Sequence, residues 1–137
     1  MSSNTKPIGV AYEDQNIIGS DSVLAGGELG YTADASGTVT QATSKSTGVT
    51  LNKSAGQITT NNASLANATN VTFTLTNSTI TAKDVVVLSV GSGATAGAYN
   101  CWVSGKTAGS CTITLRNISA SPLAEAVVIN FVVIHVL

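Results

Sequence analysis

The last thirteen residues of the chain, EAVVINFVVIHVL at positions 125–137, restrict the fold more than any other stretch. Successive residues of a β-strand point to opposite faces, so a strand with one solvated face alternates apolar and polar side chains. Here apolar side chains fill both parities, so both faces of the strand must be covered. One parity holds Val127, Ile129, Phe131 and Val133, and the other holds Val128, Val132, Ile134 and Val136.

This segment is too short to cross a bilayer as a helix, which takes about 20 apolar residues. Its many β-branched residues favour a strand over a helix. We therefore expect either a central strand of a β-protein or a strand whose second face is covered by another subunit.

Other segments also carry strand patterns. In residues 71–77, VTFTLTN, apolar residues alternate with threonine, which predicts a strand with one solvated face. Residues 84–90, DVVVLSV, do not alternate, so we expect that strand to be buried on both sides. Residues 99–119 predict a hairpin, and shorter strand candidates lie at 28–32, 38–43, 48–51 and 56–59. Roughly eight or nine short strands without a long helix predict an all-β fold, either an antiparallel β-sandwich or a jelly-roll-like barrel.

The hairpin contains the two cysteines and the single tryptophan of the chain. Folding it about Lys106 places Cys101 opposite Cys111 and puts Trp102 on the other face, among threonines. Two cysteines directly opposite each other could form a cross-strand disulfide. Because that bond is disfavoured in a reducing cytoplasm, we expect buried thiols, with a disulfide, formed natively or after release from the host, as the alternative. Two cysteines and one distant histidine are too few ligands for a structural zinc site. Trp102 indicates either a contact with another protein or a second core layer beneath the amino-terminal arm, and the sequence leaves both open.

Residues 1–30 differ from the rest of the chain. They hold scattered apolar residues and most of the acidic ones, without a sustained period, so we expect an extended amino-terminal arm before a β-domain at residues 31–137. A short strand is expected at residues 8–12, where Ile8, Val10 and Tyr12 alternate. The arm either wraps its own domain, reaches a neighbouring copy, or is a loosely tethered terminus.

Charge limits the classes of partner. Only 9% of residues are charged and the formal net charge is −1, which gives no basic surface for nucleic acid and no polybasic patch for a membrane. Neutral surfaces rich in Thr, Ser and Asn associate easily, so we expect an assembled protein. No apolar stretch typical of a signal peptide follows Met1, which predicts synthesis and retention in the cytoplasm of the producing cell. The Asn-x-Ser/Thr triplets at Asn67, Asn70, Asn77 and Asn117 are then expected to be chance products of composition.

The sequence contains no recognisable catalytic set. His135 is the only histidine and lies in an apolar strand without a GxSxG or HExxH motif, so we expect a packed structural histidine, with a pH-sensitive interface residue as the weaker alternative. Glu13 and Asp14 adjoin, but neighbouring strand residues point to opposite faces, which makes them a poor acid–base pair. We expect a non-enzymatic protein without cofactor or metal.

Two phrases of the sequence, GTVTQATSKSTGVTLNK at 37–53 and LRNIS followed by EAVVINF at 115–131, resemble a small domain that recurs in structural proteins of tailed bacteriophages. The resemblance covers residues 37–134 and brings no catalytic residue with it. It implies a virion component. Because about thirty residues precede a single domain, without room for a fibre shaft, the resemblance favours a capsid decoration, or cement, protein.

Decoration proteins of this kind imply a homotrimer that binds the major capsid protein on the outer capsid surface, after synthesis in the host cytoplasm. The alternative is a host-recognition domain that binds glycans, on a tail fibre, at a tail tip or displayed on the capsid. No nucleic-acid or membrane partner is expected. The candidate interface residues are Trp102, Val128, Val132, Ile134, Val136, Ile8, Val10 and Tyr12.

Overall fold

The computed structural model describes residue 27 and residues 29–136, and its strands lie in one compact unit, Tyr31–Leu137. The strands are β1 (Ser36–Thr40), β2 (Val49–Thr50), β3 (Ala55–Thr59), β4 (Asn70–Thr76), β5 (Val85–Ser92), β6 (Tyr99–Thr107), β7 (Ser110–Asn117) and β8 (Val128–Ile134). The only helix among the described residues is a short 3₁₀ turn, η1 (Ala33–Ala35). The all-β prediction is confirmed.

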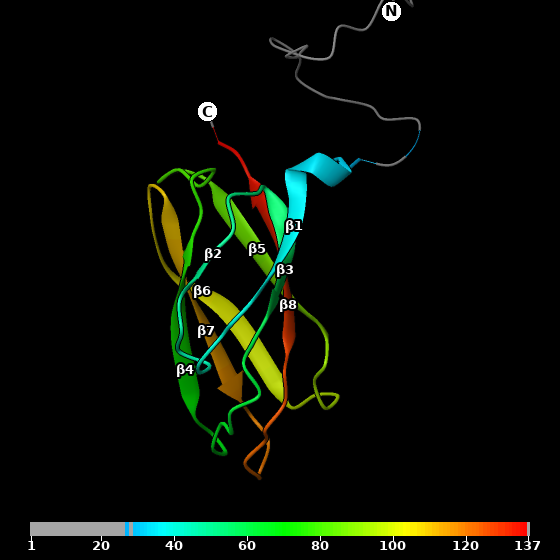
Figure 1. Ribbon diagram of the computed structural model, residues 1–137, viewed down its shortest axis with the longest axis vertical. Coiled ribbons are helices and arrows are strands. Elements are labelled where there is room, and N and C mark those ends of the chain that lie inside the picture. Colours follow the sequence, from blue (N-terminus) through cyan, green and yellow to red (C-terminus); the bar gives the residue numbers. More distant parts are fainter. Residues whose placement is uncertain (1–26, 28, 137) are drawn as a thin grey trace, which may run out of the picture. The chain divides into compact units, whose positions relative to one another are not determined.

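The strands form two four-stranded sheets that pack face to face as a sandwich (Figure 1). The first sheet has the order β1-β3-β8-β5, and the second has the order β2-β4-β7-β6. The first four strands alternate between the sheets, so β3 returns beside β1 in the same direction and β4 returns beside β2 in the same way. The sandwich prediction is therefore confirmed, but the two sheets are mixed rather than wholly antiparallel.

The last strand, β8, lies between β3 and β5, which confirms its predicted central position. One parity of its side chains, together with Val127 just before the strand, faces the second sheet and is fully or almost fully buried: Val127, Ile129, Phe131 and Val133. The other parity faces outward, where Val128 and Val132 are half-buried and Ile134 is 52% exposed. The described residues thus cover one face of β8 and leave the other face open.

The prediction that residues 84–90 are buried on both sides is wrong. β5 is an edge strand, and its outward-facing Val85 and Val87 are 51% and 46% exposed. Its inward-facing Val86 and Leu88 pack against the core. A run of apolar residues predicts that both faces need cover, but it does not tell whether the same chain provides that cover.

The hairpin prediction is correct in position and in its division of faces, but wrong in register. Cys101 lies opposite Leu115, and Cys111 lies opposite Lys106. The turn uses Gly109, whose φ of +82° suits glycine, while Gly105 lies at a bulge within β6. Both thiols are free, as expected, with Cys111 buried and Cys101 half-buried.

Oxidation of the native protein is expected to leave the two cysteines unlinked within one chain. Cys111 is four residues away from the partner of Cys101, which is about 13 Å along a strand. A disulfide spans Cα atoms no more than about 7 Å apart. Burial also raises the pKa of Cys111 to about 11, so its reactive thiolate is scarce. Non-reducing electrophoresis after diamide treatment should show unchanged monomer mobility, and a faster-migrating species would contradict the register.

Two of the Asn-x-Ser/Thr triplets have a structural reason. Asn77 is fully buried at the end of β4, where its amide donates to the Lys53 carbonyl oxygen and its Oδ1 accepts from the backbone nitrogen and hydroxyl of Thr79. Asn117 is likewise fully buried at the end of β7, and its Oδ1 accepts from the backbone nitrogen and hydroxyl of Ser119. In both triplets the hydroxyl residue two positions on completes a turn. Composition alone therefore does not account for these triplets.

Candidate interface

Four outward-facing side chains of the first sheet form a contiguous patch: Val85, Val87, Val132 and Ile134. We call this patch the aliphatic face. Val85 lies directly opposite Ile134, and Val87 lies directly opposite Val132, across the β5–β8 ladder. Directly opposite side chains on one sheet face touch each other, so the four make one surface. Contiguous exposed apolar patches of this kind mark contacts with other molecules more often than isolated apolar residues do.

The structure places the predicted interface residues in several regions. Val132 and Ile134 belong to the aliphatic face, and the exposed Val136 lies two residues beyond the end of β8. Val128 faces the same side, but it lies beyond Asn130, whose amide oxygen accepts a hydrogen bond of 3.0 Å from Gln57. That polar pair separates Val128 from the patch.

Trp102 lies on the opposite side of the sandwich. It is on the outward face of β6 in the second sheet, opposite Thr114, and it is 37% exposed. The structure therefore does not join Trp102 with the predicted residues of β8. Residues 8–12, with Ile8, Val10 and Tyr12, lie outside the described residues.

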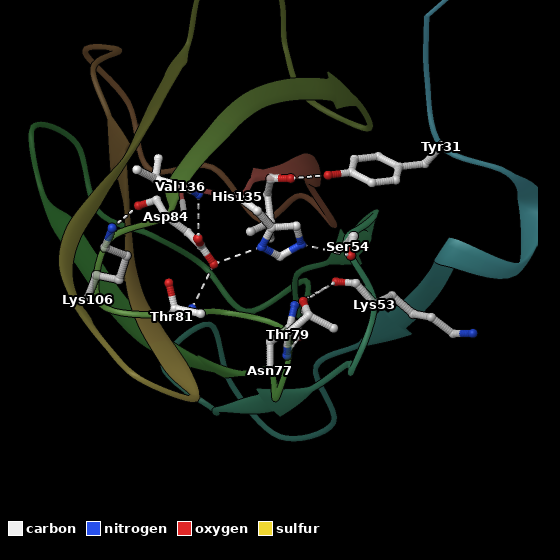
Figure 2. Close-up of polar contacts among 11 residues, drawn as sticks. Tyr31, Lys53, Ser54, Asn77, Thr79, Thr81, Asp84, Lys106, His135 and Val136 are labelled. Carbon is white, nitrogen blue, oxygen red and sulfur yellow. Dashed lines mark hydrogen bonds and ion pairs between the residues drawn. The ribbon is translucent and has the colours of Figure 1, made fainter. Parts of the chain in front are cut away.

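A buried carboxylate fixes the end of β8 beside the start of β5 (Figure 2). Asp84, which is 1% exposed, accepts hydrogen bonds from the backbone nitrogens of Thr81 at 2.7 Å and Val136 at 3.0 Å. His135 Nδ1 lies 3.0 Å from Asp84 Oδ2, and Lys106 Nζ donates to the Asp84 carbonyl oxygen. These contacts hold the segment after β8 against β5, which keeps the two strands of the aliphatic face in register.

The hydrogen bonds at Asp84 determine its charge. Burial alone would raise the pKa of the carboxyl group, but backbone bonds from Thr81 and Val136 and side-chain bonds from Thr81 and His135 hold the pKa well below its usual range. Asp84 is therefore ionised at neutral pH. Because a carboxylate only accepts hydrogen bonds, His135 Nδ1 carries the hydrogen between them.

Asp84→Asn is expected to reveal this pKa through the pH dependence of stability. A carboxyl group with a lowered pKa in the folded state stabilises the fold above its unfolded pKa of about 3.9, and this contribution is lost as the pH falls toward the folded pKa. The wild type should exceed the variant in free energy of unfolding at pH 5, and the gap should narrow steadily below pH 4. Denaturant unfolding of both proteins between pH 5 and pH 3 measures the gap. A gap independent of pH would contradict the assignment.

The order Ser54, His135, Asp84 invites comparison with a hydrolytic triad. Ser54 Oγ lies 3.5 Å from His135 Nε2, at the limit of a hydrogen bond, and His135 is exposed rather than packed in the core as predicted. Acyl transfer also needs a substrate hollow and oxyanion donors beside the nucleophile. None of the three triad-like residues lines the hollow beside Tyr99 or the hollow beside Cys111. The arrangement is better explained as an anchor for the last strand.

No group of three or more His, Cys, Asp or Glu side chains lies together in the described part of the chain. Among residue 27 and residues 29–136, no helix is long and apolar enough to cross a membrane.

Sequence reasoning missed Val85, Val87 and Asp84. The signal for the two valines was present, since DVVVLSV has the same two-sided apolar pattern as the last strand. If residues 84–90 and the last strand are assumed to pair in one sheet with one uncovered face, the sequence predicts the aliphatic face. Asp84 had no such signal, because its partners lie far away in the sequence.

Comparison with known proteins adds no assignment: no protein-family model, curated protein or solved structure matches this chain.

Proposed function

We propose that this chain is a non-enzymatic capsid decoration protein of a tailed bacteriophage, which binds the major capsid protein on the outer shell as a homotrimer. One observation supports the proposal most: the central strand of the first sheet and its edge neighbour expose an aliphatic face that the described residues do not cover. The phage-like phrases at 37–53 and 115–131 suggest the setting, and the low charge suits an assembled protein.

The energetics favour burial of this face between copies. Fully burying one large aliphatic side chain contributes about 1.5–3 kcal/mol, and half-exposed side chains retain about half of that gain. Each association step costs roughly 4–15 kcal/mol in lost freedom of motion, and a trimer takes two such steps. Four such side chains from each of three copies offset a large part of that cost, and contacts around them supply the remainder.

Binding of the protein can stabilise the capsid shell because the binding equilibrium is coupled to the assembly equilibrium of the shell. A trimer that binds the expanded shell more tightly than its separated capsomers shifts the equilibrium toward the intact shell, without any chemical step. A trimer that holds neighbouring capsid subunits together must be rigid. The contacts of Asp84 with His135 and Val136 hold β5 and β8 together and so support a rigid trimer surface.

A deletion strain of the phage tests the proposal. Particles that lack the protein should release their genome at a lower temperature than wild-type particles, while adsorption to host cells stays normal. Adding the purified protein should restore stability, and it should then be bound in amounts comparable to the capsid protein. Normal particle stability with lost adsorption would instead assign the chain to host recognition.

A further inference from the structure

The outward face of the second sheet differs chemically from the aliphatic face. Its exposed side chains on β4, β6 and β7 are polar except for one aromatic residue: Asn70, Thr72, Thr74, Thr76, Asn100, Trp102, Ser104, Thr107 and Arg116. We call this surface the hydroxyl face. Because the two faces belong to opposite sheets, a molecule that covers one leaves the other accessible.

Trp102 is the only large apolar group on the strands of the hydroxyl face, and Ile118, which is 52% exposed, follows directly after β7. An indole ring surrounded by hydrogen-bonding groups matches a pyranose ring, which has an apolar face of C–H groups and a rim of hydroxyls. Protein interfaces of ordinary size instead bury a core of several apolar side chains. A saccharide is therefore the better match for this surface.

Arg116 supplies the charge on this face. It lies opposite Asn100, so it is a diagonal neighbour of Trp102, at about 7–8 Å between Cα atoms. No ion pair involves Arg116 within the described part of the chain, and strands β2, β4, β6 and β7 contain no Asp or Glu. A guanidinium group binds carboxylates with two parallel hydrogen bonds. We infer that the hydroxyl face binds glycans containing acidic sugars, with Trp102 stacking on a pyranose ring and Arg116 pairing with a carboxylate or sulfate.

The surface beneath Trp102 is already ordered. Thr114 Oγ1 lies 2.8 Å from Thr72 Oγ1 and donates to Ser104 Oγ at 2.9 Å, which links β4, β6 and β7 on this side. Short hydroxyl side chains that are held by each other lose little conformational entropy when a ligand binds. The inference concerns a face other than the one on which the proposed trimer rests, so either can fail without the other.

The fluorescence of Trp102 provides the test, because it is the only tryptophan in the chain. The full-length protein is titrated with hexagalacturonate, a sialic acid tetramer and a heparin hexasaccharide, with neutral maltohexaose as the reference. For at least one acidic probe, the change in Trp102 fluorescence should reach saturation and should be larger than the change with maltohexaose. Added salt should weaken the binding of that acidic probe.

Variants locate the binding. By calorimetry, Trp102→Ala and Arg116→Gln should each weaken binding of the acidic probe by at least about tenfold. Ser89→Ala, at an exposed position of β5 in the other sheet and outside the aliphatic face, should bind the probe as the wild type does. Arg116 is exposed, so its variant keeps the fold even if Trp102→Ala does not, and circular dichroism checks both. Absence of binding to all three acidic probes, or equal binding by wild type and Arg116→Gln, would overturn the inference. Loss of capsid binding by Trp102→Ala without any glycan binding would also overturn it and assign Trp102 to a protein contact.

Discussion

Val87→Glu is expected to abolish self-association while leaving the fold intact. Val87 faces outward on the edge strand β5 and is 46% exposed, so the single chain has room for a charged side chain there. In an assembled protein the carboxylate would be buried against aliphatic groups without a partner, which costs several kcal/mol. Size-exclusion chromatography at micromolar concentration should show the variant eluting as a single chain, later than the wild type.

Thr74→Glu is the matched control for this variant. Thr74 is also an exposed outward-facing strand residue, but it lies on β4 of the second sheet. It should elute as the wild type does, since the added charge lies on the side away from the aliphatic face. If Thr74→Glu dissociates the protein as well, or if Val87→Glu does not, the aliphatic face is not where copies meet.

Asn117→Ala is expected to have the largest effect on stability, a loss of about 3 kcal/mol. The Asn117 amide donates to the carbonyl oxygens of Leu65 and Ser121, at 3.0 Å and 2.9 Å, and so ties the end of β7 to two loops. The variant loses these two bonds and the two that Asn117 Oδ1 accepts from Ser119, at about 0.5–1.5 kcal/mol for each bond. The two carbonyl oxygens keep one donor each, because the Leu65 oxygen also accepts from the Leu123 backbone nitrogen and the Ser121 oxygen also accepts from the Ser119 hydroxyl. The melting temperature should fall by roughly 15 °C, as measured by thermal unfolding.

Asn70→Ala provides the comparison for Asn117→Ala. Asn70 begins an identical type of triplet, but its side chain is exposed at the start of β4. A surface substitution of this kind changes stability by no more than about 0.5 kcal/mol. A similar loss for both variants would mean that burial of the asparagine is not the reason for the effect.

The strand patterns of the sequence predict the architecture because alternation is a local property. The alternating residues 71–76 lie in β4, with its threonines outward and Phe73 and Leu75 in the core. The same reasoning predicts the central position of β8. It does not identify what covers the second face of β8, because the pattern is the same whether one chain or two provide the cover.

Register and long-range contacts are less predictable. The hairpin register depends on a bulge between Val103 and Gly105 and on a turn at Gly109, and a one-residue bulge leaves no distinct signal in the sequence. Asp84 and His135 are 51 residues apart, and they meet only because β5 and β8 pair. The candidate site is therefore predicted only as a set of apolar positions on β8, and its β5 half emerges from the topology.

The most direct test of the central claim is the mass of the purified full-length protein, measured by multi-angle light scattering across a micromolar concentration range. If copies meet through the aliphatic face as a trimer, the mass should be three times the 13.7 kDa of one chain. A mass of 13.7 kDa at every concentration would contradict it.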